Sequence, residues 1–356
     1  MPAETEPATL RDTAADGPAA GGGPSGHPAV TSPAGTGSLD GAGPDAAAGD
    51  GAPRYAPEWL ALREGADAAA RAPRLLGPLV RHWADGRDRE EERPQRPGRP
   101  GRQGPLVIRD LGCGTGSMSR WLAPRLSGPQ HWILHDHDPE LLELAAERMP
   151  RTAADGSPVT VETEQGDATL LTADVLAGTS LVTASALLDL LTREEVDALA
   201  ASCAAAGCPA LLVLSVAGRV ELSPADPLDG EIADAFNAHQ RRAVDGRRLL
   251  GPDAVTEAAE AFTRHGLTVR TEASPWRLGP GGPAGPAGPA GGGPGLAAEW
   301  LRGWVGAAVA QCPELTEPAE TYLRRRLESC AAGELRAVVH HSDLLALPAP
   351  PAGGTP

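Results

Sequence analysis

From residue 105 onward, short apolar runs typical of β-strands alternate with stretches that have helical periodicity. The runs are rich in Val, Leu and Ile, and turn residues separate them from the helical stretches. Such alternation is typical of parallel strands joined by helices that cover both faces of one sheet. We therefore expect an α/β fold with a doubly wound, mostly parallel, seven-stranded sheet. The seven strands are predicted at residues 106–110, 131–135, 159–163, 181–185, 210–216, 268–271 and 335–340.

Composition divides the rest of the chain. Among the 356 residues are 44 glycines and 36 prolines. The first 52 residues carry almost no large apolar side chain, so burial there cannot offset the entropy cost of ordering. We expect a disordered acidic tail at 1–52, an N-terminal helical cap at 53–84 and a charged flexible linker at 85–104. The main domain is expected at 105–347, with a helical insertion at 228–242 and a flexible Gly/Pro loop at 279–295. A second disordered tail is expected at 348–356.

The charge and the cysteines exclude several classes of partner. The net charge is −16, which disfavours a nucleic-acid substrate, because proteins bind phosphate backbones mainly through Lys and Arg. No apolar run reaches the length of about 18 residues that spans a bilayer, and the N-terminus lacks the features of an export signal. The five cysteines include no Cys-x-x-Cys pair, so neither a disulfide framework nor a metal site is expected. We predict a cytoplasmic protein that acts on a small molecule. Its oligomeric state does not follow from the sequence.

The segment Asp-Leu-Gly-Cys-Gly-Thr-Gly at 110–116 lies directly between a predicted strand and a predicted helix. Its alternate glycines allow a tight turn with positive φ and keep Cβ atoms away from a ligand above the turn. A loop that leads into a helix also offers free backbone N–H groups to a carboxylate or a phosphate. Asp136 follows twenty residues after Gly116, at the end of the next strand, where acidic residues bind the two hydroxyls of a ribose. Together these features predict a site for a nucleoside-containing ligand at the C-terminal edge of the sheet.

The spacing of the glycines distinguishes between two classes of ligand. Dinucleotide-binding folds use Gly-x-Gly-x-x-Gly, whereas here Ser117 takes the place of the last glycine. Gly-x-Gly-x-Gly with an acid two residues upstream resembles the first motif of the class I S-adenosylmethionine-dependent methyltransferases. The sequence His-Asp-His-Asp-Pro at 135–139 resembles the second motif of that family, in which the acid three residues before Pro holds the ribose. Gly-Asp-Ala at 166–168 and the segment 182–188 resemble its third and fourth motifs.

The resemblance covers residues 105–278 and implies a Rossmann-like fold. It also implies that S-adenosylmethionine is the cofactor and S-adenosylhomocysteine the product. The cofactor-binding residues that it implies are Asp110, Gly112, Cys113, Gly114, Gly116, Asp136, His137, Asp167, Ala168, Ala184 and Ser185.

The resemblance further implies in-line transfer of a methyl group to a nucleophilic acceptor. Because the protein mainly contributes alignment and water exclusion to such a reaction, no catalytic residue carries over from the family. Asp189 and His239 are candidates for a general base, but Asp189 also has the position of a helix cap, and His239 lies in a polar run. The pair at 340–341, His-His, is expected at the surface.

Two helical stretches flank the core, at 59–83 and 228–242. We predict that they form a lid over a small-molecule pocket, with Arg63 or Arg241 facing an anionic acceptor. Two other functions stay open at this point. One is an NAD(P)-dependent oxidoreductase, and the other is a catalytically silent methyltransferase-like scaffold that works through partners of its acidic tail.

Overall fold

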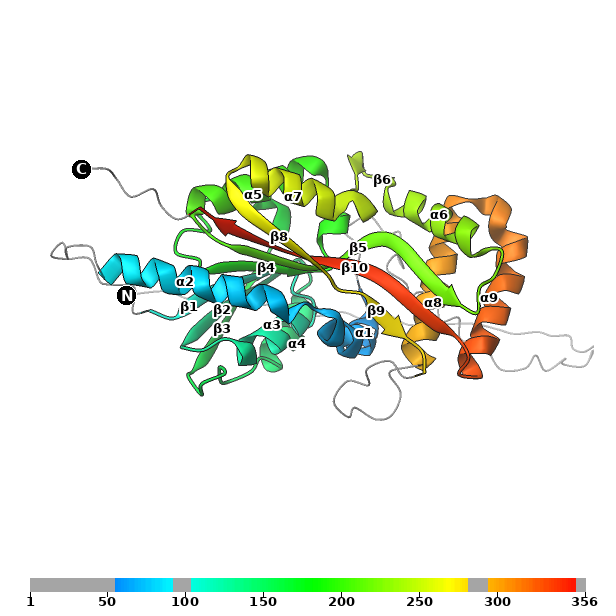
Figure 1. Cartoon of the computed structure of the whole chain (residues 1–356), viewed down its shortest axis with the longest axis horizontal. Helices are drawn as coiled ribbons and strands as arrows, with labels where there is room; N and C mark the ends of the chain where they lie inside the picture. The colour runs from blue at the N-terminus through cyan, green and yellow to red at the C-terminus, as the bar shows by residue number, and fades with distance from the viewer. Residues whose placement is uncertain (1–54, 92–103, 281–293, 350–356) are drawn as a thin grey trace, which may run out of the picture. The chain divides into compact units, whose positions relative to one another are not determined.

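A computed structural model describes residues 55–91, 104–280 and 294–349 (Figure 1). Its central sheet has the strand order β3-β2-β1-β4-β5-β10-β8, with a short strand β9 paired to β10. The first five strands of this order are parallel, and β10 is antiparallel to both of its long neighbours. The prediction of a mostly parallel seven-stranded sheet is therefore confirmed, with β9 as an addition. The strands are β1 (Leu106–Leu111), β2 (Gln130–Asp136), β3 (Val159–Gln165), β4 (Leu181–Ser185), β5 (Ala210–Ser223), β8 (Leu267–Ala273), β9 (Trp276–Leu278) and β10 (Arg336–Pro348).

Helices cover both faces of the sheet, as Figure 1 shows. On one face, α5 (Arg193–Ala206) and α7 (Ala254–Arg264) bury an apolar cluster that includes Val196 and Phe262. On the other face, apolar side chains of α2 (Leu76–Glu91), α3 (Ser117–Leu122) and α4 (Pro139–Glu147) form a second cluster. The central strands are covered on both sides, which explains why they read as nearly continuous apolar runs.

A third apolar cluster lies against the far halves of β5 and β10. The sequence predicts the fifth strand only at 210–216 and the last strand only at 335–340, but the two pair antiparallel from Arg336–Ser223 to Ala346–Ala210. Beyond residue 215, half-buried and exposed side chains alternate along β5, so the local sequence there lacks the apolar run of a central strand. The helices of this third cluster are α1 (Pro57–Ala70), α6 (Asp229–Gln240), α8 (Pro294–Gln311) and α9 (Thr316–Ala331).

Several boundaries differ from the prediction or lie outside the description. Helix α2 continues to Glu91, although the sequence predicts a linker from residue 85, because Arg and Glu are helix-forming residues as well as linker residues. Residues 243–248 form a small hairpin of β6 (Ala243–Val244) and β7 (Arg247–Arg248). The predicted tail at 1–52, most of the linker, the interior of the Gly/Pro loop and the tail from residue 350 lie outside the described residues.

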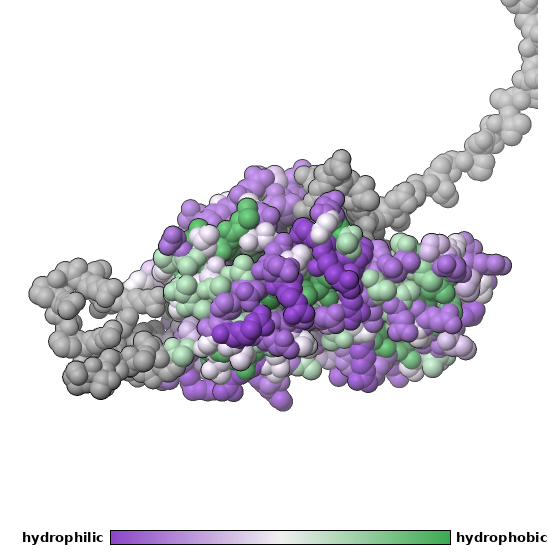
Figure 2. All heavy atoms as spheres, turned by 90° about the horizontal axis from the view of Figure 1, so that it is seen from above, coloured by the Kyte–Doolittle hydropathy of each residue, from purple (hydrophilic) through white to green (hydrophobic). Residues whose placement is uncertain are grey.

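On the face that Figure 2 shows, hydrophilic residues surround smaller apolar areas. None of the helices in the part of the chain that the structure describes is long and apolar enough to cross a membrane.

Candidate functional site

The glycine loop joins β1 to α3 at the C-terminal edge of the sheet. Gly112, Gly114 and Gly116 have φ values of 56°, 53° and 81°, which L-residues with a side chain rarely adopt. A Cβ atom at Gly112 would lie 3.2 Å from Leu187, and one at Gly114 would lie 3.2 Å from Leu60. The loop thus requires glycine for its backbone conformation as well as for space.

Asp136 ends β2 and holds the loop in place. Its Oδ2 accepts a hydrogen bond from the backbone N–H of Gly114 at 2.8 Å, and its Oδ1 accepts one from the backbone N–H of Asp138 at 3.1 Å. His137 Nδ1 also lies 3.3 Å from Oδ1, whereas Oδ2 keeps a second lone pair that can accept a hydrogen bond from a ligand hydroxyl. Asp138 caps α4 by accepting from the backbone N–H of Glu140.

Asp110, at the end of β1, is fully buried. Its Oδ1 accepts a hydrogen bond from Thr183 Oγ1 at 2.7 Å, whereas its Oδ2 has no hydrogen-bond partner among the described residues. Burial raises the pKa of Asp110 to about 7, and the Thr183 hydroxyl and the charge of Arg71 oppose this rise. A buried, half-satisfied carboxyl beside a cavity is typical of a group that meets a ligand.

A cavity of about 360 Å³ lies above this edge of the sheet. Of the predicted cofactor-binding residues, Gly116 and Ala184 do not line it; Gly116 instead lies close to Ala145 of α4, and Ala184 is buried in the sheet. Asp189 lines the cavity, but His239 does not. The predicted residues that do line it are Asp110, Gly112, Cys113, Gly114, Asp136, His137, Asp167, Ala168 and Ser185.

The opposite end of the cavity is aromatic. Trp59 of α1, Phe236 of α6 and the stacked pair Trp300 and Trp304 of α8 line it, together with Trp276 of β9. Trp59, Arg63 and Asp67 follow one another at four-residue spacing, so they share one face of α1, and this face lines the cavity.

The predicted lid is present in part. Side chains of α1 and α6 both line the cavity, and Arg63 is among them. Arg241 is not; it forms an ion pair with Asp253 at 2.6 Å instead.

The prediction that both adjacent histidines lie at the surface is wrong for His341. This side chain is buried, lines the cavity and lies against Trp276 with ring centroids 5.2 Å apart, whereas His340 pairs with Glu221 at 2.9 Å. Neighbouring residues of a strand point to opposite faces, and the ring of Trp276 packs on the face that carries His341.

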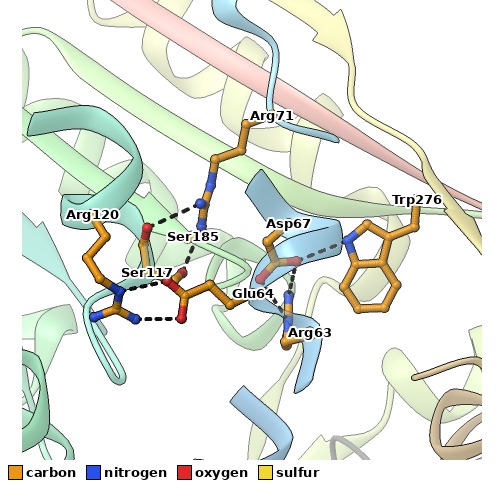
Figure 3. A network of polar contacts seen from close by, with 8 residues as sticks. All are labelled: Arg63, Glu64, Asp67, Arg71, Ser117, Arg120, Ser185 and Trp276. Atoms are coloured by element: carbon orange, nitrogen blue, oxygen red, sulfur yellow. Dashed lines mark hydrogen bonds and ion pairs between the residues drawn. The ribbon is translucent and has the colours of Figure 1, made fainter. Parts of the chain in front are cut away.

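A polar network joins α1 to the core (Figure 3). Arg71 is buried and donates to Ser117 Oγ at 2.9 Å and to Ser185 Oγ at 3.1 Å. Glu64 accepts two hydrogen bonds from Arg120 at 2.6 and 2.7 Å. Sequence reasoning missed Arg71, because a single arginine in a helical stretch gives no local signal of burial.

Asp67 is the second anchor of α1. It accepts from Arg63 Nε at 3.0 Å and from the indole N–H of Trp276 at 3.0 Å (Figure 3). Burial lowers the pKa of Arg71, and the charge of Asp67 is the largest effect that opposes this shift. A buried carboxylate therefore balances two arginines at the edge of the cavity.

None of the five cysteines forms a disulfide, and Cys113 is buried in the glycine loop. Within residues 55–91, 104–280 and 294–349, no group of three or more His, Cys, Asp or Glu side chains has an arrangement that could hold a metal ion.

Comparison with known proteins adds a family to this geometry. Residues 108–209 match the model of a family described as "Methyltransferase domain". No curated protein sequence matches the chain.

Solved structures similar to the chain include the YcgJ protein from Bacillus subtilis (13% identity, TM-score 0.37, covering 76% of this chain and 99% of that one). They also include magnesium protoporphyrin IX methyltransferase from Synechocystis (16% identity, TM-score 0.35, 64% and 83%). A third is the cyclopropane synthase MmaA2 from Mycobacterium tuberculosis (12% identity, TM-score 0.36, 68% and 79%).

The family match covers β1 to β4, the glycine loop between β1 and α3, and Asp136 at the end of β2. Residues 108–209 of this chain therefore match a methyltransferase domain.

Proposed function

We propose that the protein transfers the methyl group of S-adenosylmethionine to a small-molecule acceptor. One observation carries this proposal: a single cavity reaches from the glycine loop and Asp136 to an aromatic wall formed by α1, α6 and α8. The first end has the residues that a nucleoside-containing donor requires. The second end is apolar and covered, as a pocket for a small organic molecule requires.

The residues at the first end fit the cofactor. The unpartnered Oδ2 of Asp110 suits the ammonium group of the methionine portion, and Gly112 and Gly114 leave room where a Cβ atom would intrude. Asp136 Oδ2 retains a lone pair for a ribose hydroxyl, and Asp167 is assigned to the adenine amino group. Of the remaining residues, Cys113, His137, Ala168 and Ser185 line the donor pocket, while Gly116 and Ala184 support it from behind.

The bound cofactor supplies a methyl group on a sulfonium, with a neutral thioether as the leaving group. What remains for the protein is to orient the acceptor and to exclude water. Helices α1, α6 and α8 perform this task by covering the cavity. If the acceptor is a hydroxyl, Asp189 is the lining carboxylate assigned to receive its proton. His239 lies outside the cavity and takes no part in this arrangement.

Position 117 supports this function over nicotinamide chemistry. The dinucleotide pattern requires a glycine here. Ser117 instead carries a hydroxyl that accepts a hydrogen bond from the buried Arg71, so its side chain is part of the network that positions α1. We also retain the proposals of a cytoplasmic location and of a substrate that is not a nucleic acid. The net charge of −16 supports the second of these.

The first test is the substitution Asp136→Asn, with S-adenosylhomocysteine binding measured by isothermal titration calorimetry. Loss of the charge weakens the hydrogen bonding to the ribose, so we expect at least a roughly tenfold loss of affinity. Glu143→Ala is the control, because Glu143 is an exposed acid on α4 outside the cavity. A thermal unfolding curve without ligand checks that the variant is folded. Unchanged affinity in folded D136N would contradict the proposed donor site.

A further inference from the structure

The aromatic end of the cavity contains a large share of the few aromatic residues in this chain. Aromatic residues are only 3% of the sequence, yet six aromatic side chains line this one cavity. Trp300 and Trp304 stack with ring centroids 5.2 Å apart and an angle of 16° between their planes. Indole rings give flat, polarizable walls that favour flat ligands, because stacked and edge-on ring contacts add to the energy of burial.

Two of these indoles have an unused hydrogen-bond donor. The Nε1 atoms of Trp59 and Trp304 are buried, and neither has a partner anywhere in the described residues. Indoles at other places in the fold are paired: Trp83 donates to the Ser180 carbonyl and Trp132 donates to Gln130. Buried N–H groups in native proteins nearly always have an acceptor, so unpaired donors at a cavity indicate that a ligand supplies one.

The charges at this end are already balanced. The guanidinium of Arg63 lies 5.1 Å from the centroid of the Trp276 ring and forms an ion pair with Asp67 at 3.0 Å. A cationic ligand would need the face of the Trp276 ring, which the positively charged Arg63 already occupies. An anionic ligand is not required to neutralise Arg63, because Asp67 already does so. The anionic acceptor predicted from the sequence therefore loses its main support.

His341 adds a neutral polar group to the same wall. Its Nδ1 atom is buried without a hydrogen-bond partner in the part of the chain described. Burial, assisted by the charge of Arg63, lowers the pKa of His341 to about 3, so the imidazole is uncharged at neutral pH. The wall thus combines flat apolar surfaces with three polar atoms that have no charge of their own.

We propose that the methyl acceptor is a neutral, planar aromatic molecule with hydrogen-bond-accepting atoms at its edge, held by the indole N–H groups of Trp59 and Trp304. This assignment rests on the proposed methyltransferase function, since it names the substrate class of the same site. A hydrocarbon, whether aliphatic or aromatic, would leave both indole donors unpaired, and an aliphatic ligand would not match the flat indole walls.

The test compares three probes on the protein saturated with S-adenosylhomocysteine, with dissociation constants from saturation-transfer difference NMR. Coumarin is planar and has a carbonyl at its edge, octahydrocoumarin keeps the carbonyl without the flat ring, and naphthalene keeps the flat ring without the carbonyl. We expect coumarin to bind about tenfold more tightly than octahydrocoumarin, because only the flat ring uses the indole walls.

The substitutions Trp59→Phe and Trp304→Phe keep an aromatic ring and remove the donor. Each should weaken coumarin binding roughly fivefold and leave naphthalene binding within about twofold of wild type, because only coumarin accepts the lost hydrogen bond. Trp83→Phe is the matched control, since it also removes an indole N–H but lies outside the cavity. Thermal unfolding checks that the variants are folded.

Three results would overturn the assignment: no coumarin binding at millimolar concentration, equal binding of coumarin and octahydrocoumarin, or wild-type coumarin affinity in both phenylalanine variants. A separate titration of S-adenosylhomocysteine distinguishes this failure from failure of the proposed function. If the donor product binds and coumarin does not, only the acceptor assignment fails. If coumarin behaves as expected without any donor binding, the methyltransferase proposal fails.

Discussion

Asp110 and Asp136 are acidic residues at the ends of neighbouring strands, yet their surroundings differ. Asp136 accepts hydrogen bonds from two backbone N–H groups, those of Gly114 and Asp138. Asp110 has the Thr183 hydroxyl on one oxygen and lies fully buried, so desolvation dominates and raises its pKa to about 7. The proposed donor pocket thus contains one carboxylate held by two backbone N–H groups and one whose charge depends on pH near neutrality.

The substitution Asp110→Asn tests this difference through stability. The pKa of Asp110 is raised above its unfolded value, so between about pH 4 and pH 7 the folded chain binds more protons than the unfolded chain. The contribution of this group to stability therefore declines as pH rises across that interval. The uncharged D110N variant lacks this decline, and we expect it to gain up to about 3 kcal/mol relative to wild type between pH 5 and pH 8. Urea unfolding at both pH values measures the gain, with Glu143→Gln as control. An equal difference between D110N and wild type at both pH values would refute the raised pKa.

At the scale of elements, α1 covers part of the cavity at the edge of the sheet. It is held by polar contacts at three places: Glu64 with Arg120 of α3, Asp67 with Trp276 of β9, and Arg71 with Ser117 and Ser185 (Figure 3). Because Asp67 is a buried carboxylate that balances two arginines, its charge matters more than that of a surface ion pair.

Removing that charge should loosen α1. Asp67→Asn leaves Arg63 and Arg71 without their shared counter-charge, and breaking a buried ion pair on one side costs about 3–5 kcal/mol. We expect a loss of that order in the free energy of unfolding by urea, together with weaker binding of S-adenosylhomocysteine. Glu58→Gln, an exposed acid in the first turn of the same helix, should change neither quantity. A D67N variant as stable as wild type would show that the network does not anchor α1.

At the scale of the molecule, two apolar clusters cover the two faces of the sheet and a third lies at the extended ends of β5 and β10. The cavity is lined both by the sheet edge and by this third cluster. The proposed donor pocket and the proposed acceptor pocket therefore depend on different parts of the chain. Deleting the predicted N-terminal segments one at a time tests whether the cavity depends on α1.

Deletion of residues 1–52 should leave the unfolding temperature and the affinity for S-adenosylhomocysteine unchanged, because that segment contributes almost no large apolar side chain. Deletion of residues 53–83 removes α1 and half of α2, and with them the buried Leu79 and Arg71, so donor binding should be lost. Calorimetry and thermal unfolding of the two truncated chains measure both effects. Equal binding by the two would rule out a role of α1 as a lid.

The sequence alone determined the sheet and the donor end of the cavity. The alternating glycines with positive φ and the acid at the end of the next strand are local features. The segment 110–116 and Asp136 were therefore enough to predict them. The apolar runs predicted the strand positions in the same way. The exceptions are β5 and β10, which pair with each other beyond their predicted ends.

The acceptor end was decided only by the tertiary structure. Trp59, Trp276 and Trp304 come from segments far apart in the chain, and no local pattern records that they meet. The same holds for His341, which packs against the distant Trp276, and for Asp67, whose partner Trp276 is 209 residues away. Local backbone preferences act over a few residues, whereas contacts between distant side chains exist only after the chain has folded.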